Sequence, residues 1–244
     1  MRYLLYTTIL VCILSCGTDR NDDCITTMGN VSNELRSVDE FSKLYVEDRI
    51  KVVLIQDSSK AGTLELTGPE NLLAQVTSEI QDGELRLRNR NTCNFVRSFD
   101  YELKVNVFIN TLDRLTVESI AEVSCIDTIL VNRLEIYHFA LSDIDLKLSG
   151  EEVYVQSRNS AETRLSGDIR VLKGSIEEIS NLLALDLQCE EVLLDSHTKL
   201  NCELNASKGL YIKIFNSGDV LYKSEPTDYK IVEVSTGTGR LLKK

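Results

Sequence analysis

Residues 143–155 read Asp-Ile-Asp-Leu-Lys-Leu-Ser-Gly-Glu-Glu-Val-Tyr-Val, and this stretch shows the pattern that governs the second half of the chain. Apolar and polar residues alternate on both sides of a Ser-Gly pair, as in Leu146/Leu148 and Val153/Val155. A period of two is typical of half-buried strands, and Ser-Gly is typical of a turn. The stretch therefore predicts two short strands joined by a corner.

Similar units recur about every 20 residues beyond residue 112. One series of apolar pairs is Leu115/Val117, Leu134/Ile136, Val153/Val155, Ile169/Val171, Val192/Leu194 and Leu210/Ile212. An interleaved series is Val123/Cys125, Leu146/Leu148, Thr163/Leu165, Leu185/Leu187 and Cys202/Leu204. Two strands per repeat predict an all-β fold, a parallel β-helix or β-solenoid over residues 111–244. An antiparallel β-sandwich is the alternative, but Asp82-Gly83 is the one Asp-Gly and there is no Asn-Gly to form tight hairpins.

Residues 37–110 form a small strand-rich N-terminal unit in this interpretation. Alternating stretches such as 50–54 and 101–109 predict strands, and Asp82-Gly83 predicts a turn. One short helix is expected after Pro69, with Leu72, Leu73, Val76 and Ile80 on its apolar side.

The first residues have the features of a lipoprotein signal peptide, which we assign to residues 1–15. Arg2 precedes an apolar run of about a dozen residues, roughly 18 Å as a helix and too short to span a bilayer. Ile13-Leu14-Ser15-Cys16 resembles a bacterial lipobox, so Cys16 is the expected lipidation site, carrying acyl chains such as palmitate. Residues 16–36 are then expected to be a polar tether to the membrane.

Composition argues against several functions. The net charge of -11 and pI near 4.8 make a nucleic-acid partner unfavourable. The chain has two His, no Trp, and no Cys-x-x-Cys or nucleotide-binding glycine loop. The sequence therefore predicts no catalytic residues, no metal site and no cofactor.

Five cysteines remain after Cys12 and Cys16 are set aside. Cys24 and Cys93 lie outside the repeats and are candidates for a disulfide. Cys125, Cys189 and Cys202 are in phase with apolar residues and are expected to fill the core as free thiols.

The remaining polar candidates are assigned structural or solvent-facing roles. His138 is in phase with Leu134 and Ile136, and His197 lies in a corner segment. Asp143, Asp145 and Asp168 are the carboxylates that a β-helical polysaccharide enzyme would need on one face, but Asp143 and Asp145 alternate with core residues as on any strand. A cation at Asp168 and Asp219 is a weaker alternative.

The order of these elements resembles a known family. It includes Phe41–Val46, Ile50–Asp57, Leu64–Leu73, Val76–Leu87 and Tyr101–Val107, then the Ser-Gly-Asp repeats, Gly218–Pro226 and Thr236–Leu242. Together they resemble the auto-transporter adhesin head GIN domain family over residues 38–244. The resemblance implies a β-helical, secreted or lipid-anchored envelope protein with an adhesion-type role and no established catalytic residues. Ser157-Arg158-Asn159 and Ser196-His197-Thr198 depart from the family's usual Gly-rich corners, which puts the register of the middle layers in question.

Three functions follow from this sequence. The first is a non-catalytic, lipid-anchored outer-membrane protein, facing the periplasm or the cell surface, that binds a glycan or a protein. The second is a structural or signalling envelope component that self-associates through the faces or ends of the solenoid. The third, with least support, is a β-helical enzyme acting on polysaccharide.

Overall fold

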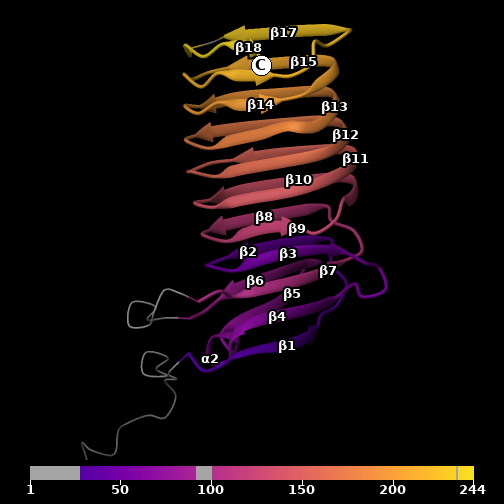
Figure 1. Ribbon diagram of the computed structural model, residues 1–244, viewed down its shortest axis with the longest axis vertical. Helices are drawn as coiled ribbons and strands as arrows, with labels where there is room; N and C mark the ends of the chain where they lie inside the picture. The colour runs from indigo at the N-terminus through magenta and orange to yellow at the C-terminus, as the bar shows by residue number, and fades with distance from the viewer. Residues whose placement is uncertain (1–27, 92–100, 235) are drawn as a thin grey trace, which may run out of the picture.

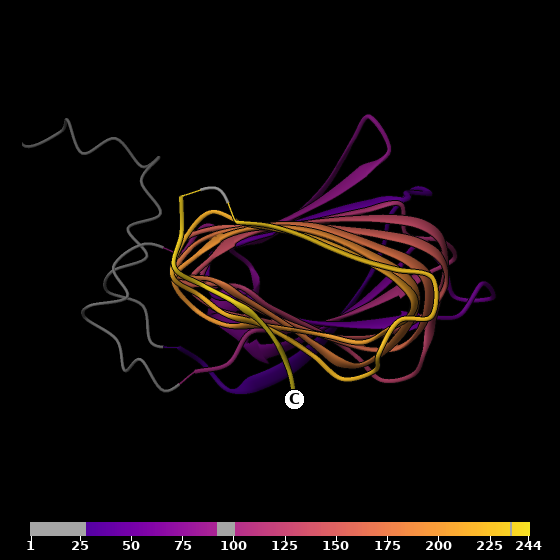
Figure 2. The same cartoon turned by 90° about the horizontal axis from the view of Figure 1, so that it is seen from above.

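The computed structural model describes residues 28–91, 101–234 and 236–244. It is a rod of about six stacked coils (Figure 1). Seen along the rod axis, the coils superpose as a flattened ring (Figure 2). The predicted β-solenoid is thereby confirmed. Its strands are β1 (Val31–Ser37), β2 (Lys43–Glu47), β3 (Lys51–Gln56), β4 (Thr63–Pro69), β5 (Val76–Gln81), β6 (Glu84–Asn89), β7 (Lys104–Ile109), β8 (Arg114–Ser119), β9 (Glu122–Cys125), β10 (Ile129–Ala140), β11 (Asp143–Ser157), β12 (Glu162–Glu178), β13 (Asn181–Thr198), β14 (Cys202–Leu204), β15 (Ala206–Ile214), β16 (Val220–Tyr222), β17 (Tyr229–Val234) and β18 (Leu241–Lys243).

The coils build two broad faces. Face 1 is the parallel ladder β6–β2–β8–β10–β11–β12–β13–β15–β17. Face 2 is the parallel ladder β7–β3–β9–β11–β12–β13–β14–β16–β18. The long strands β11, β12 and β13 belong to both ladders, because their first halves lie in face 2 and their second halves in face 1.

Glycines permit the bends within these long strands. Gly150 has φ +152° and Gly167 has φ +106°. A Cβ at Gly167 would lie 2.0 Å from the Leu148 carbonyl oxygen, and one at Gly150 would lie 1.7 Å from that of Val131. Only glycine lets the backbone of one coil pass this close to the coil below.

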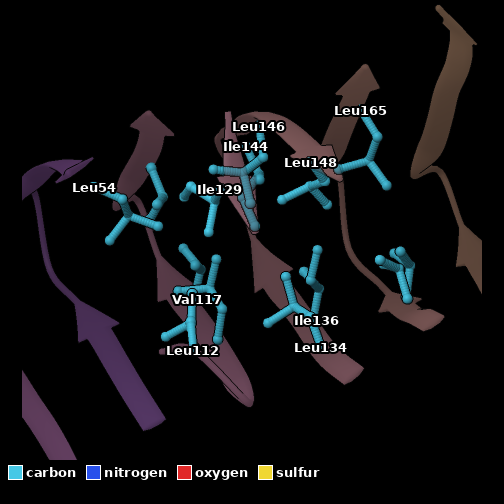
Figure 3. Close-up of a cluster of buried hydrophobic side chains, with 14 of the residues drawn as sticks. Leu54, Leu112, Val117, Ile129, Leu134, Ile136, Ile144, Leu146, Leu148 and Leu165 are labelled. Atoms are coloured by element: carbon cyan, nitrogen blue, oxygen red, sulfur yellow. The ribbon is translucent and has the colours of Figure 1, made fainter. Parts of the chain in front are cut away.

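The core is a set of aliphatic columns between the two faces. One column contains Leu134, Val153, Leu172, Val192 and Leu210, each in register with the next and almost fully buried. Figure 3 shows side chains from successive coils, including Leu134, Ile136, Ile144 and Leu146, pointing into this interior. Burial of each such side chain contributes roughly 1.5–3 kcal/mol. The expected stacking of repeats is therefore confirmed.

The register differs from the expectation in the middle of face 1. Leu172, and not Ile169 or Val171, lies beside Val153. The prediction for this layer was wrong because Ile169 follows directly on the Gly167 corner and pairs with Gly150, before face 1 begins. At the start of the column, Leu115 pairs with Ile136, two residues from the position expected.

The register of face 2 also needs correction. Thr163 pairs with Ile144 in the coil before it and with Leu182 in the coil after it, whereas the repeat predicted Leu146 and Leu185 at these positions. Leu148 and Leu187 are displaced in the same way. The register of β12 and β13 shifts between Arg164 and Ser166, which is a β-bulge. An apolar pattern cannot show where such an extra residue is inserted.

The N-terminal unit differs from its prediction in two ways. Helix α2 spans only Glu70–Leu73, and Val76 and Ile80 lie in strand β5. Asp82-Gly83 does form the expected tight turn, between the antiparallel strands β5 and β6. In addition, β2 and β3 pair with β8 and β9, so the stacking begins well before residue 111.

The tether expected over residues 16–36 overlaps a strand of the fold. Residues Val31–Ser37 form β1, which pairs antiparallel with β4, and Thr67 donates a hydrogen bond to Asn33 at 2.8 Å. The strand has the polar, half-exposed pattern of a sheet edge, which is why its sequence resembles a linker.

Both ends of the core carry charged side chains. At the N-terminal end, Arg36 on β1 donates a hydrogen bond to the Leu73 carbonyl at 3.1 Å and pairs with Glu34. At the C-terminal end, Lys230 on β17 takes the column position above Leu210. Its ammonium donates to the Tyr222 hydroxyl at 3.0 Å and to Glu225. Charges pointing inward on an edge strand oppose the addition of a further strand.

Candidate functional site

The outer surface of face 1 gathers most of the aromatic residues that the structure describes. The alternation that directs Val153 and Val155 inward directs Tyr154 outward, and the same holds for Tyr137 beside Ile136. We call these residues the aromatic face: Tyr45, Tyr137, Phe139, Tyr154, Tyr211, Phe215 and Tyr229. All of them are partly exposed.

The centre of the aromatic face is a cluster on β10 and β11. The ring centroid of Tyr137 lies 6.0 Å from that of Phe139 and 6.2 Å from that of Tyr154. Guanidinium groups cover part of these rings: Arg114 lies 5.5 Å from the Tyr137 centroid and Arg158 lies 4.2 Å from that of Phe139. Such contacts hold rings and cations in a fixed arrangement before any ligand arrives.

An ion pair supports this cluster from below. The Arg114 guanidinium donates to Glu135 at 2.7 Å, and this hydrogen bond keeps the pKa of the Glu135 carboxyl below its usual range. Because the pair is partly exposed, its main effect is to orient Arg114 over Tyr137, and it adds little to stability.

The lower end of the aromatic face is centred on Tyr45. The guanidinium groups of Arg86 and Arg88, both on β6, each lie 5.4 Å from the centroid of its ring. Its hydroxyl lies 2.6 Å from Glu47 and 2.7 Å from Glu118. Burial, and then hydrogen bonding to these two carboxylates, raises the pKa of Tyr45, so its hydroxyl stays protonated and acts as a donor.

The upper end of the aromatic face also combines aromatic rings with a carboxylate. His197 and Phe215 stack with centroids 4.1 Å apart and an interplanar angle of 3°. Tyr229 lies over Gly209, where a Cβ would come within 2.3 Å of its ring, and donates to Glu191 at 3.3 Å. Aromatic and Arg side chains interleaved with carboxylates thus extend along much of the rod. Tyr and Arg are among the residue types enriched at protein–protein interfaces and their hot spots.

The aromatic face was not predicted from the sequence. The usable signal was an aromatic residue between the two members of an apolar pair, as with Tyr154 and Tyr211. Since inward and outward positions alternate, such a residue must lie on the outer surface once the pair is buried.

The structure describes only some of the cysteines that the sequence singles out. Cys16, Cys24 and Cys93 lie outside the described residues, so lipidation and the disulfide remain predictions. Cys189 and Cys202 are buried free thiols, as expected, and burial raises the pKa of each to about 12. Cys125 is a free thiol that is only half-buried against the core.

Both histidines contact other side chains of the fold. His138 is fully buried, and its Nδ1 lies 2.9 Å from the Thr163 hydroxyl. Burial lowers the pKa of His138 to about 4, so the ring is neutral near pH 7. His197 stacks on Phe215, as described above.

The candidate carboxylates are spread over face 2 and the corners. Asp143 and Asp145 are exposed on β11, beside Glu162 and Arg164 of β12. Asp168 pairs in register with Ser149, and Asp219 accepts a hydrogen bond from the Arg240 amide at 2.8 Å. Within the part of the chain that the structure describes, no three His, Cys, Asp or Glu residues cluster as a metal site would require. None of the helices in that part is long and apolar enough to cross a membrane.

Fold and surface together define a β-solenoid whose exposed aromatic and charged groups lie along its sides. The model of the family described as "Putative auto-transporter adhesin, head GIN domain" matches residues 40–226, and the chain belongs to this family. This confirms the resemblance found in the sequence. No protein with a curated function is similar enough to match the chain.

Solved structures show the same fold. A putative adhesin from Bacteroides fragilis is 19% identical with a TM-score of 0.81, over 88% of this chain and 97% of that one. A putative adhesin from Parabacteroides merdae is 17% identical with a TM-score of 0.65, over 88% and 98%. A protein from Parabacteroides distasonis described as a putative lipid binding protein is 17% identical with a TM-score of 0.63, over 88% and 97%. At these identities the likeness concerns the fold alone.

Proposed function

We propose that this protein is a non-catalytic, lipid-anchored binding module of the bacterial outer membrane, of the adhesin type. Its ligand is a protein or glycan that docks on the aromatic face. The observation that carries the proposal is the central cluster of Tyr137, Phe139 and Tyr154, whose rings are partly exposed and held by Arg114 and Arg158. A rigid set of aromatic and Arg side chains binds with little loss of side-chain entropy.

Binding through the sides of the rod fits the observed ends better than end-to-end assembly does. Self-association by stacking would need open hydrophobic layers at both ends. Val232 is 39% exposed above Ile212 at the C-terminal end, but Lys230 on the same strand and Arg36 at the N-terminal end place charges in the two end layers. This favours the binding module over a structural component that polymerises.

The binding proposal is tested on glycan and matrix-protein arrays with the fragment 28–244, which retains β1. Tyr137→Ser combined with Tyr154→Ser should reduce binding at least about tenfold, because the double variant removes two rings of the cluster. Leu221→Ser, on the outer surface of face 2, is the matched control and should bind as the wild type does. Equal binding by the double variant and the wild type would rule out the aromatic face.

The membrane anchor is tested separately in cells. Cys16→Ala should leave the protein soluble after cell fractionation, since the acyl chains have no other attachment point in the proposal. Continued association of the Cys16→Ala protein with membranes would contradict lipid anchoring at this residue without affecting the binding proposal.

A further inference from the structure

Face 2 contains a step between β13 and the coil that follows it. Leu183 pairs with Glu203, and Cys189 pairs with Ala206. The chain therefore uses six residues in β13 where the next coil uses three. The Asn205 amide bridges the step by donating to the Leu185 carbonyl at 3.3 Å and to Gln188 at 3.1 Å. The surplus residues of β13 form a ledge that the next coil does not cover.

A hollow of about 480 Å³ lies at this ledge. Its volume falls within the range of small-molecule sites in proteins. Leu165, Leu183 and Leu185 supply apolar lining, and the lining also includes three acidic residues, Asp145, Asp186 and Glu203. The basic residues of the lining are Arg164, Lys223 and Lys244.

The basic residues differ in how tightly they are held. Arg164 pairs with Glu162 at 2.6 Å, and Lys244 pairs with Glu203 at 2.7 Å. The ammonium of Lys223 lies 3.9 Å from Asp186, whose side chain is 84% exposed. A contact this long and exposed is weak. Of the three cations of the hollow, Lys223 would give up the weakest ion pair on binding an incoming carboxylate.

We propose that this hollow binds an acidic sugar, a pyranose ring that carries a carboxylate. The carboxylate pairs with Lys223 in place of its long contact with Asp186. The less polar side of the ring rests on Leu183 and Leu185, and ring hydroxyls donate to Asp145 and Asp186. Few other small solutes combine one negative charge, several hydroxyl donors and a flat apolar side.

This site is on the opposite face of the rod from the aromatic face. Binding at this hollow therefore does not depend on binding at the aromatic face, and either proposal can be wrong without affecting the other. A glycan bound there in addition would give the protein two points of attachment to an acidic polysaccharide, with the gain in avidity that two linked sites provide.

The test uses the fragment 28–244 with glucuronate and galacturonate as probes, measured by calorimetry and by saturation-transfer NMR. Both should bind, and glucose, which lacks the carboxylate, should bind at least about tenfold more weakly. Lys223→Met should weaken glucuronate binding about tenfold or more. Lys213→Met, on face 1, is the matched control and should leave that binding unchanged.

A second variant examines the apolar floor. Leu185→Ser should also weaken glucuronate binding, and an unchanged circular dichroism spectrum and melting temperature would show that the solenoid is intact. The proposal is overturned if neither uronate binds, if glucose binds equally well, or if Lys223→Met binds as the wild type does. Equal binding of L-alanine would overturn it too, because the hollow would then recognise zwitterions in general.

Discussion

The role of each residue in this rod depends on whether its side chain points into the coil or out of it. Val153 and Tyr154 are neighbours in sequence, yet one is fully buried and the other forms part of the aromatic face. His138 shows the cost of placing a titratable group on the inner side. It is fully buried, with one ring nitrogen held by Thr163.

The buried histidine predicts a pH-dependent stability. The pKa of His138 is about 4 in the folded state, against about 6.5 for an exposed histidine. Between these values the unfolded state binds the extra proton, so the stability present above about pH 6.5 is lost as the pH falls towards 4. This amounts to about 3 kcal/mol from this residue.

Urea unfolding at a series of pH values measures the effect. His138→Gln should have a smaller fall in unfolding free energy between pH 6.5 and 4 than the wild type. His197→Gln is the control and should keep the wild-type fall. If His138→Gln loses as much stability over that interval as the wild type does, the assignment to His138 is wrong.

At the scale of elements, the strands were more predictable than their register. The alternation around Leu134 and Val153 indicated strands that stack, and they do. Ile169 was misplaced because the sequence does not show where the Gly167 corner ends and face 1 begins. β1 was not predicted as a strand because five of its seven residues are polar and its two apolar residues, Val31 and Leu35, are exposed, so no buried apolar face marks it.

The corner glycines should be among the positions least tolerant of substitution. Gly167→Ala forces a Cβ to within 2.0 Å of a carbonyl oxygen at φ +106°, so we expect a loss of about 3 kcal/mol or more. Gly83 has φ +71° with nothing within 4 Å of its Cβ position, and Gly83→Ala should cost only about 1–2 kcal/mol. Thermal and urea unfolding of both variants measure these losses. Equal losses would show that the close approach at Gly167 is not important.

The charge of Lys230 on β17 should prevent a second rod from adding to the C-terminal end. Lys230→Val continues the column above Leu210 and removes the ammonium bound by Tyr222 and Glu225. We expect this variant to self-associate, with a larger sedimentation coefficient at high concentration than the wild type. Lys213→Val, on the outer surface of face 1, is the control. A Lys230→Val protein that sediments as the wild type does would contradict the capping role.

At the scale of the whole molecule, the chain is a rod with two long sides and charged ends. The sequence was sufficient for the solenoid and the family, because these depend on a repeated pattern. It did not reveal the aromatic face or the step at Leu185, since both arise from the alignment of residues from different coils. Function in this fold therefore depends on which side chains the register brings together.

Hydroxyl-radical footprinting of the fragment 28–244, with and without an array-selected ligand, tests the central claim most directly. Tyr137, Phe139 and Tyr154 should become less reactive when the ligand is bound, while Leu221 and Leu242 on face 2 keep their reactivity. Unchanged reactivity of the three aromatic residues, with protection confined to face 2 or to the ends of the rod, would contradict the account.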